Sequence, residues 1–122
     1  MNVGLWNIQV LLALVFLIHG RLMLSPPASI QPGMAYVLAI PTRFRQSIGV
    51  AEILGAIGLV LPGLTGVLPL LTPLAVAGLV ILMVSAAIFH ARRKEAPNIA
   101  FNLILLAMAA FVAYGRFVLV PL

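Results

Sequence analysis

The chain has no cysteine, and only two of its 122 residues are acidic. The lack of cysteine excludes disulfides, thiolate metal sites and dithiol redox relays. Charged residues make up 7% of the sequence, whereas a soluble domain carries about 25%. So few charges cannot cover a water-facing surface, and 64% of the residues are hydrophobic. We therefore expect lipid to be the main solvent of this protein.

What is abundant is apolar sequence in long runs. A helix that crosses a bilayer needs ~20 residues, within a range of ~17–25. Prolines mark the boundaries of these runs. Pro26 follows the first run, and Pro62 ends the second. Pro73, after a capping Thr72, begins the third run, and Pro97 begins the fourth. The sequence predicts an all-α transmembrane four-helix bundle, one domain over residues 1–122 with spans at about 5–24, 46–61, 74–91 and 98–118.

The first connection is the longest, and part of it is apolar. Residues 34–40 lie between Pro32-Gly33 and Pro41 and are too few to cross a membrane. This segment predicts a short interfacial or re-entrant helix, with a plain loop on the end of the bundle as the alternative.

The net charge of +5 comes from basic residues at the ends of the apolar runs. This placement is typical of membrane-flanking anchors and argues against a nucleic-acid partner. All of them except Arg116 flank or fill the first and third connections: Arg21, Arg43, Arg45, Arg92, Arg93 and Lys94. The positive-inside rule then places these connections in the cytoplasm and both termini outside, in a multi-pass protein of the cell (inner) membrane.

Ionisable and polar residues inside spans are costly, so they are candidates for function. With this topology, every helix brings polar groups to the inner half of the bundle, and the outer half holds only Gln9 and Arg116. The ligand-binding candidates are Glu52, His19, His90, Asn102 and Arg21. Glu52 has two interpretations that the sequence leaves open. It either holds helices together through a partner such as His19, Arg21 or His90, or it binds a ligand or a proton.

Two histidines on facing helices are also the arrangement that binds haem or a metal in some bundles. Histidines at helix ends are more often hydrogen-bonded, so we expect neither haem nor a metal. No cofactor is evident, and a quinone or a lipid is the candidate ligand. The glycines have a packing role, because small residues let helix backbones approach closely in lipid. The predicted packing positions are Gly49, Gly55, Gly58 and Gly78.

Several stretches together resemble the DoxX-like family of small membrane proteins. They are Leu5-Trp6, residues 49–59 (GVAEILGAIGL) with Pro62, residues 71–75 (LTPLA), His90 with Arg92-Arg93, and Tyr114-Gly115-Arg116. The resemblance covers nearly the whole chain and implies a four-helix membrane fold. Glu52, Gly55, Gly58 and Arg116 match motif positions, but no established catalytic residue carries over with them.

In that family, some members are membrane subunits of thiosulfate–quinone oxidoreductase, others belong to oxidative-stress complexes, and a distant branch resembles receptor-assembly chaperones. We therefore expect an accessory or redox-associated subunit that binds a lipophilic, quinone-like molecule in the inner half of the bundle and is not an enzyme on its own. A membrane chaperone or assembly factor and a small proton-coupled transporter are the alternatives. Expected partners are the lipid bilayer, a membrane or redox protein, and further copies of the chain.

Overall fold

A computed structural model describes residues 2–27 and 34–121. The elements in chain order are α1 (Asn2–Leu24), α2 (Tyr36–Ala39), α3 (Thr42–Thr65), α4 (Leu71–Arg92), α5 (Ala96–Tyr114) and η2 (Gly115–Leu119), a π-helical turn that continues α5. Within the described part of the chain, four segments are long and apolar enough to cross a membrane: α1, α3, α4 and Ala96–Leu119. The predicted all-α fold with four spans is confirmed.

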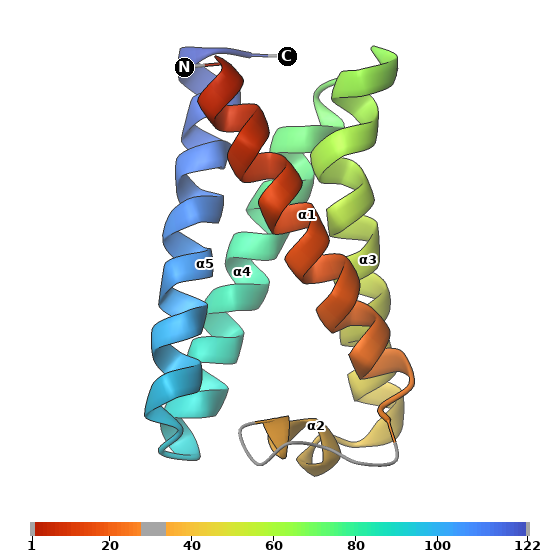
Figure 1. Ribbon diagram of the computed structural model, residues 1–122, viewed down its shortest axis with the longest axis vertical. Helices are drawn as coiled ribbons and strands as arrows, with labels where there is room; N and C mark the ends of the chain where they lie inside the picture. The colour runs from red at the N-terminus through yellow and green to blue at the C-terminus, as the bar shows by residue number, and fades with distance from the viewer. Residues whose placement is uncertain (1, 28–33, 122) are drawn as a thin grey trace.

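The helices alternate in direction, so the connections fall at two ends. The described N- and C-terminal residues lie at one end together with the α3–α4 connection (Figure 1). We call this the terminal end. The short helix α2 and the α4–α5 connection lie at the other, which we call the α2 end (Figure 1). Helix α1 packs along α3, and α4 packs along α5. Helices α3 and α4 meet near the terminal end and diverge toward the α2 end (Figure 1).

Helix α2 confirms the short helix that was predicted in the first connection, and the plain loop is wrong. It has a single turn, and its neighbours Ala35 and Pro41 lie just outside it. Tyr36 and Val37 are buried and pack with Met23 of α1. The apolar residues of this segment therefore cover the α2 end of the bundle.

The second predicted span ends too early at Pro62, because α3 continues through this proline to Thr65. A proline has no N–H, so the carbonyl of Gly58 loses its partner within the helix. The hydroxyl of Thr72 in α4 donates to that carbonyl oxygen at 2.7 Å. A side chain from a neighbouring helix thus satisfies the freed carbonyl, as it must inside a membrane. The helix ends instead at Gly66, which has a φ of 72°.

The same contact corrects the predicted role of Thr72. Helix α4 begins at Leu71, and Leu70 occupies the N-cap position without a side-chain cap. Thr72 is therefore inside the first turn, where it is fully buried and bonded across to α3. Pro73 lies in the first turn as predicted, where its missing N–H costs nothing.

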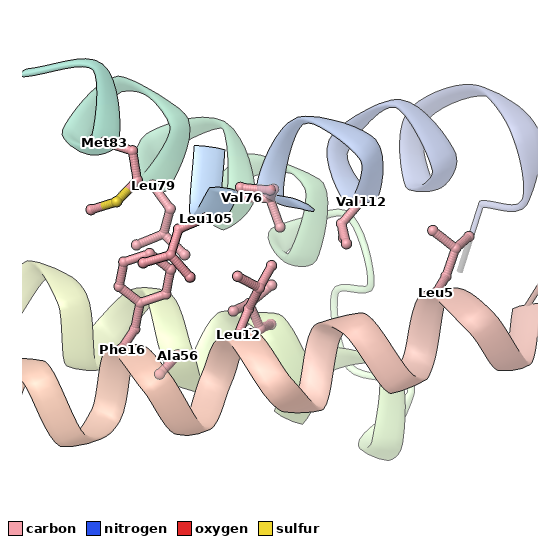
Figure 2. Close-up of a cluster of buried hydrophobic side chains, with 11 residues drawn as sticks. Leu5, Leu12, Phe16, Ala56, Val76, Leu79, Met83, Leu105 and Val112 are labelled. Carbon is pink, nitrogen blue, oxygen red and sulfur yellow. The ribbon is translucent and has the colours of Figure 1, made fainter. Parts of the chain in front are cut away.

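The core fills the space between the four spans with aliphatic side chains and one large aromatic, Phe16. Figure 2 shows Leu5, Leu12 and Phe16 of α1 pointing toward side chains of α4 and α5. Many other large apolar side chains are exposed along all four spans, for example Ile18, Leu54, Ile81 and Ile104. A surface of this kind is suited to contact with lipid tails.

Candidate functional site

The site begins where α1 and α3 touch. A Cβ atom added to Gly20 would lie 2.9 Å from the carbonyl oxygen of Gly49, and one added to Gly49 would lie 2.7 Å from the carbonyl oxygen of Gly20. Only glycine permits this approach, since real Cβ atoms do not come so close to backbone. His19 precedes Gly20, and Glu52 lies one helical turn after Gly49. The glycine pair therefore brings these two polar side chains together.

Glu52, His19 and Tyr36 form a continuous hydrogen-bonded chain. His19 Nδ1 lies 2.7 Å from Glu52 Oε2, and His19 Nε2 lies 2.6 Å from the hydroxyl of Tyr36. Glu52 is 1% exposed, so its carboxylate needs such a partner. The chain connects α1, α3 and α2, and it joins the middle of the bundle to the α2 end.

The protonation state of the Tyr36 phenol bears on the direction of these hydrogen bonds. Burial raises the pKa of Tyr36 to about 12, and the negative charges of Glu52 and Glu95 add to this effect. The phenol therefore keeps its proton near neutral pH and is able to donate it to a neutral His19 at Nε2. The proton of a neutral imidazole then resides on Nδ1, from which it is donated to Glu52.

A second acidic residue pairs with the second histidine beside this chain. His90 Nδ1 lies 2.8 Å from Glu95 Oε1, and Arg93 Nε lies 3.2 Å from the same oxygen. The rings of His90 and Tyr36 meet edge to face with centroids 4.6 Å apart. Both carboxylates of the protein are thus bound to histidines, and Tyr36 lies between the two pairs.

His19, Tyr36, Glu52 and His90 line a cavity of about 480 Å³. The remaining lining is mostly apolar and comes from α1, α3, α4 and the segment around α2; it includes Met23, Ile48, Leu82, Met83, Ala86 and Phe89. The exposed residues of the lining are Phe44, Ser47 and Ala51 of α3, Ser85 of α4, and Ala39 and Pro41 of the segment around α2. The cavity therefore opens sideways between two spanning helices.

Asn102 of α5 also lines this cavity and differs from the other polar groups. It is 7% exposed, and its amide nitrogen has no hydrogen-bond partner within the described structure. A buried donor without an acceptor costs about 1–3 kcal/mol. Asn102 is therefore the polar group of the cavity whose hydrogen-bonding capacity is left open.

The structure places four of the five predicted ligand-binding residues at the cavity: Glu52, His19, His90 and Asn102. Arg21 is exposed and does not line it. Within the described ranges, no group of three or more His, Cys, Asp or Glu side chains is arranged to hold a metal ion.

The predicted flanking residues at the α2 end are arranged as follows. Arg43, Arg92, Arg93 and Lys94 are exposed. Arg45 is half-buried, and its Nε donates to the carbonyl oxygen of Met23 at 2.7 Å, which ties α3 to the end of α1.

Arg116 is not an exposed flanking residue, because its side chain points into the bundle and is 2% exposed. Its Nε donates to Gln9 Oε1 at 2.6 Å, and its Nη1 donates to Asn2 Oδ1 at 2.8 Å and to the carbonyl oxygen of Val120 at 3.0 Å. Its guanidinium carbon lies 5.4 Å from the centre of the Trp6 ring. Arg116 therefore joins both ends of the chain at the terminal end.

Of the four glycines predicted to pack against a neighbouring helix, the prediction for Gly78 is wrong. It is exposed, and a Cβ atom there would meet nothing within 4 Å. Gly55 and Gly58 pack against Leu79 and Ala75 of α4, and Gly49 packs against Gly20. Spacing on one helix does not identify the neighbour, so it does not distinguish these positions from Gly78.

Sequence reasoning missed Tyr36, Gly20 and the pairing of Gln9 with Arg116. Tyr36 stands out in retrospect as the one hydroxyl-bearing side chain in an apolar segment that is too short to cross the membrane. Gly20 adjoins a candidate histidine, which is a signal for close helix approach. Nothing local connects Gln9 to Arg116, because they lie at opposite ends of the chain.

The fold and the site define a class: a polytopic membrane protein whose spanning helices enclose a largely apolar cavity lined in part by polar side chains. The chain belongs to the DoxX-like family, whose family model matches residues 7–112. No curated protein and no solved structure matches the chain. The predicted family membership is therefore confirmed.

Proposed function

We propose that this protein binds a lipophilic, quinone-like molecule in the cavity between α3 and α4. The observation that carries the proposal is the cavity itself. It has about 480 Å³ of space, within the range of ~300–1,000 Å³ that is typical of small-molecule sites. Such sites are mostly apolar and contain a few convergent polar groups. Here these are Glu52, His19, Tyr36 and Asn102.

The position of the mouth supports a ligand that arrives through the membrane. The exposed lining residues Ser47 and Ala51 belong to one spanning helix, and Ser85 belongs to the next. A lipophilic molecule in the bilayer would enter between these helices without crossing water. Its polar head would meet Glu52 and His19, and its tail would remain among the apolar walls.

In this proposal the protein acts as an accessory or redox-associated subunit that holds the ligand for a partner in the same membrane. Glu52 then has both roles that the sequence left open. Its bond to His19 holds α1 against α3, and the same pair forms the polar end of the cavity.

Binding of decylubiquinone to purified protein in lipid nanodiscs tests the proposal. We expect saturable binding to the wild type and at least a tenfold loss in Ala86→Phe, because Ala86 lines the cavity and a phenyl ring would fill it. Ala107→Phe is the matched control, since Ala107 is exposed on α5 and does not line the cavity. Equal binding by both variants, or no saturable binding to the wild type, would refute the proposal.

A second variant tests the role of Glu52. Glu52→Gln keeps the size of the side chain and removes its charge. Because the proposal gives Glu52 both roles, we expect Glu52→Gln to weaken binding per folded protein and also to lower the thermal midpoint. A fall in the thermal midpoint with unchanged binding per folded protein would remove Glu52 from the site and leave it a structural role.

A further inference from the structure

The amide nitrogen of Asn102 is a donor that the protein leaves unused. In the described structure, Asn102 Nδ2 and one guanidinium nitrogen of Arg116 are the buried side-chain nitrogen or oxygen atoms without a hydrogen-bond partner. Of these two residues, only Asn102 lines the large cavity. Buried polar groups in native proteins are generally paired, so an unpaired donor on a residue that lines a cavity indicates what is to occupy it.

The other donors on the cavity wall are already used within the protein. The hydroxyl of Tyr36 is paired with His19 Nε2, and His19 Nδ1 is paired with Glu52. Ser47 and Ser85 donate to carbonyl oxygens one turn earlier in their own helices. His90 Nδ1 is paired with Glu95. Among the described residues that line this cavity, Asn102 carries the buried side-chain nitrogen without a partner. The carboxylate of Glu52 also lines the cavity, and it can only accept hydrogen bonds.

We propose that Asn102 recognises a carbonyl oxygen, so that the cavity selects carbonyl-bearing lipophilic molecules, such as quinones, over hydrocarbons of the same shape. This inference rests on the proposed function and adds which ligands the cavity prefers. A carbonyl oxygen accepts a hydrogen bond and carries no proton that would need an acceptor. It therefore satisfies Asn102 without disturbing the Glu52–His19–Tyr36 chain. A hydrocarbon leaves the amide unpaired.

One alternative partner for the amide is water. Asn102 also lines a smaller cavity of about 40 Å³, next to Asn98 and Phe101. A cavity of that size is large enough for a water molecule. If water occupied it and satisfied Asn102, the amide would not discriminate between ligands, and the experiment below separates the two cases.

The test compares two probes that share a carbon skeleton. Menadione carries two carbonyl oxygens, and 2-methylnaphthalene carries none. Binding of each to protein in nanodiscs is measured for the wild type and for Asn102→Leu, relative to its partition into the lipid. We expect Asn102→Leu to weaken menadione binding about tenfold, the scale of one buried hydrogen bond, and to leave 2-methylnaphthalene binding unchanged. Asn7→Leu, at an exposed position in α1, is the control.

Size-exclusion profile and helical content check that the variant is folded, and Asn102→Ala replaces it if the leucine is not accommodated. An equal change for both probes, or none for either, overturns the selectivity and leaves the proposed function standing. If the wild type binds neither probe, the inference and the proposed function fail together.

Discussion

Glu52 and Arg116 are buried side chains of opposite charge, and the protein accommodates them in different ways. Glu52 has His19 as a partner at 2.7 Å. Within the described structure, Arg116 has neutral acceptors and the face of Trp6, because both acidic residues of the sequence are bonded to histidines elsewhere, Glu52 in the middle of α3 and Glu95 at the α2 end. A buried cation of this kind is costly to disturb, since removing it leaves the buried side-chain oxygen of Gln9 without its donor.

Glu95 makes stability depend on pH at the α2 end. Burial raises the pKa of Glu95, but the hydrogen bonds from His90 and Arg93 and the charge of Arg93 outweigh it, and the pKa lies below its ordinary value of 4.5. The unfolded chain therefore binds a proton first as the pH falls. The contribution of the Glu95 ion pairs to folding stability is fully present above pH 4.5, and it is lost as the pH drops through the pKa of Glu95 in the folded protein.

We expect the thermal midpoint of the wild type in detergent to fall more steeply than that of Glu95→Gln as the pH drops below 4.5. Near neutral pH, the variant should lose only about 0.5 kcal/mol, as for other partly exposed ion pairs. Circular dichroism melts at a series of pH values measure both quantities. Parallel pH profiles for the two proteins would show that Glu95 is not the titrating group.

At the scale of elements, the contact between α1 and α3 decides whether the site exists. The two backbones touch at Gly20 and Gly49, and the histidine–carboxylate pair forms immediately beside this point. Farther along α3, Gly55 and Gly58 leave room for the side chains of Leu79 and Ala75 of α4. Helix α3 therefore carries small residues toward two neighbours.

Gly49→Ala should destabilise the protein by about 1–3 kcal/mol, because its Cβ would overlap the Gly20 carbonyl and force the helices apart. Gly78→Ala is the matched control, and it should be neutral or stabilising by up to about 1 kcal/mol, since alanine favours helix and the site is open. Thermal midpoints in detergent measure the difference. Equal effects in the two variants would contradict the close approach of α1 and α3.

Much of the fold, but less of the site, can be predicted from the sequence. Apolar length identifies the spans, because a bilayer imposes a minimum on each. The end of α3 is misplaced, because the partner that lets Pro62 remain helical is Thr72, which belongs to another helix. The side-chain acceptors of Arg116 are missed for a similar reason, because Gln9 and Asn2 belong to α1. Local sequence reports the cost of a proline or a charge and does not report the distant group that offsets it.

At the scale of the whole molecule, charge distinguishes the two ends. All Lys and Arg residues except Arg116 lie at the α2 end. The positive-inside rule therefore still predicts that this end faces the cytoplasm. The proposed cavity would then lie in the inner half of the membrane.

The lack of cysteine makes this orientation simple to test, because a single introduced cysteine is a unique label. Val67 is exposed in the α3–α4 connection, and Arg92 is exposed at the end of α4. We expect a membrane-impermeant maleimide to label Val67→Cys in intact cells and to label Arg92→Cys only after permeabilisation. The reverse pattern would invert the topology.

The sideways mouth between α3 and α4 has a consequence for how affinity is expressed. A ligand that enters from the bilayer equilibrates with its mole fraction in the lipid and not with its concentration in the buffer. Adding empty vesicles at a fixed total amount of ligand would dilute it in two dimensions and release it from the protein. A dissociation constant quoted per litre would then drift with the lipid content, whereas one quoted per mole of lipid would stay constant.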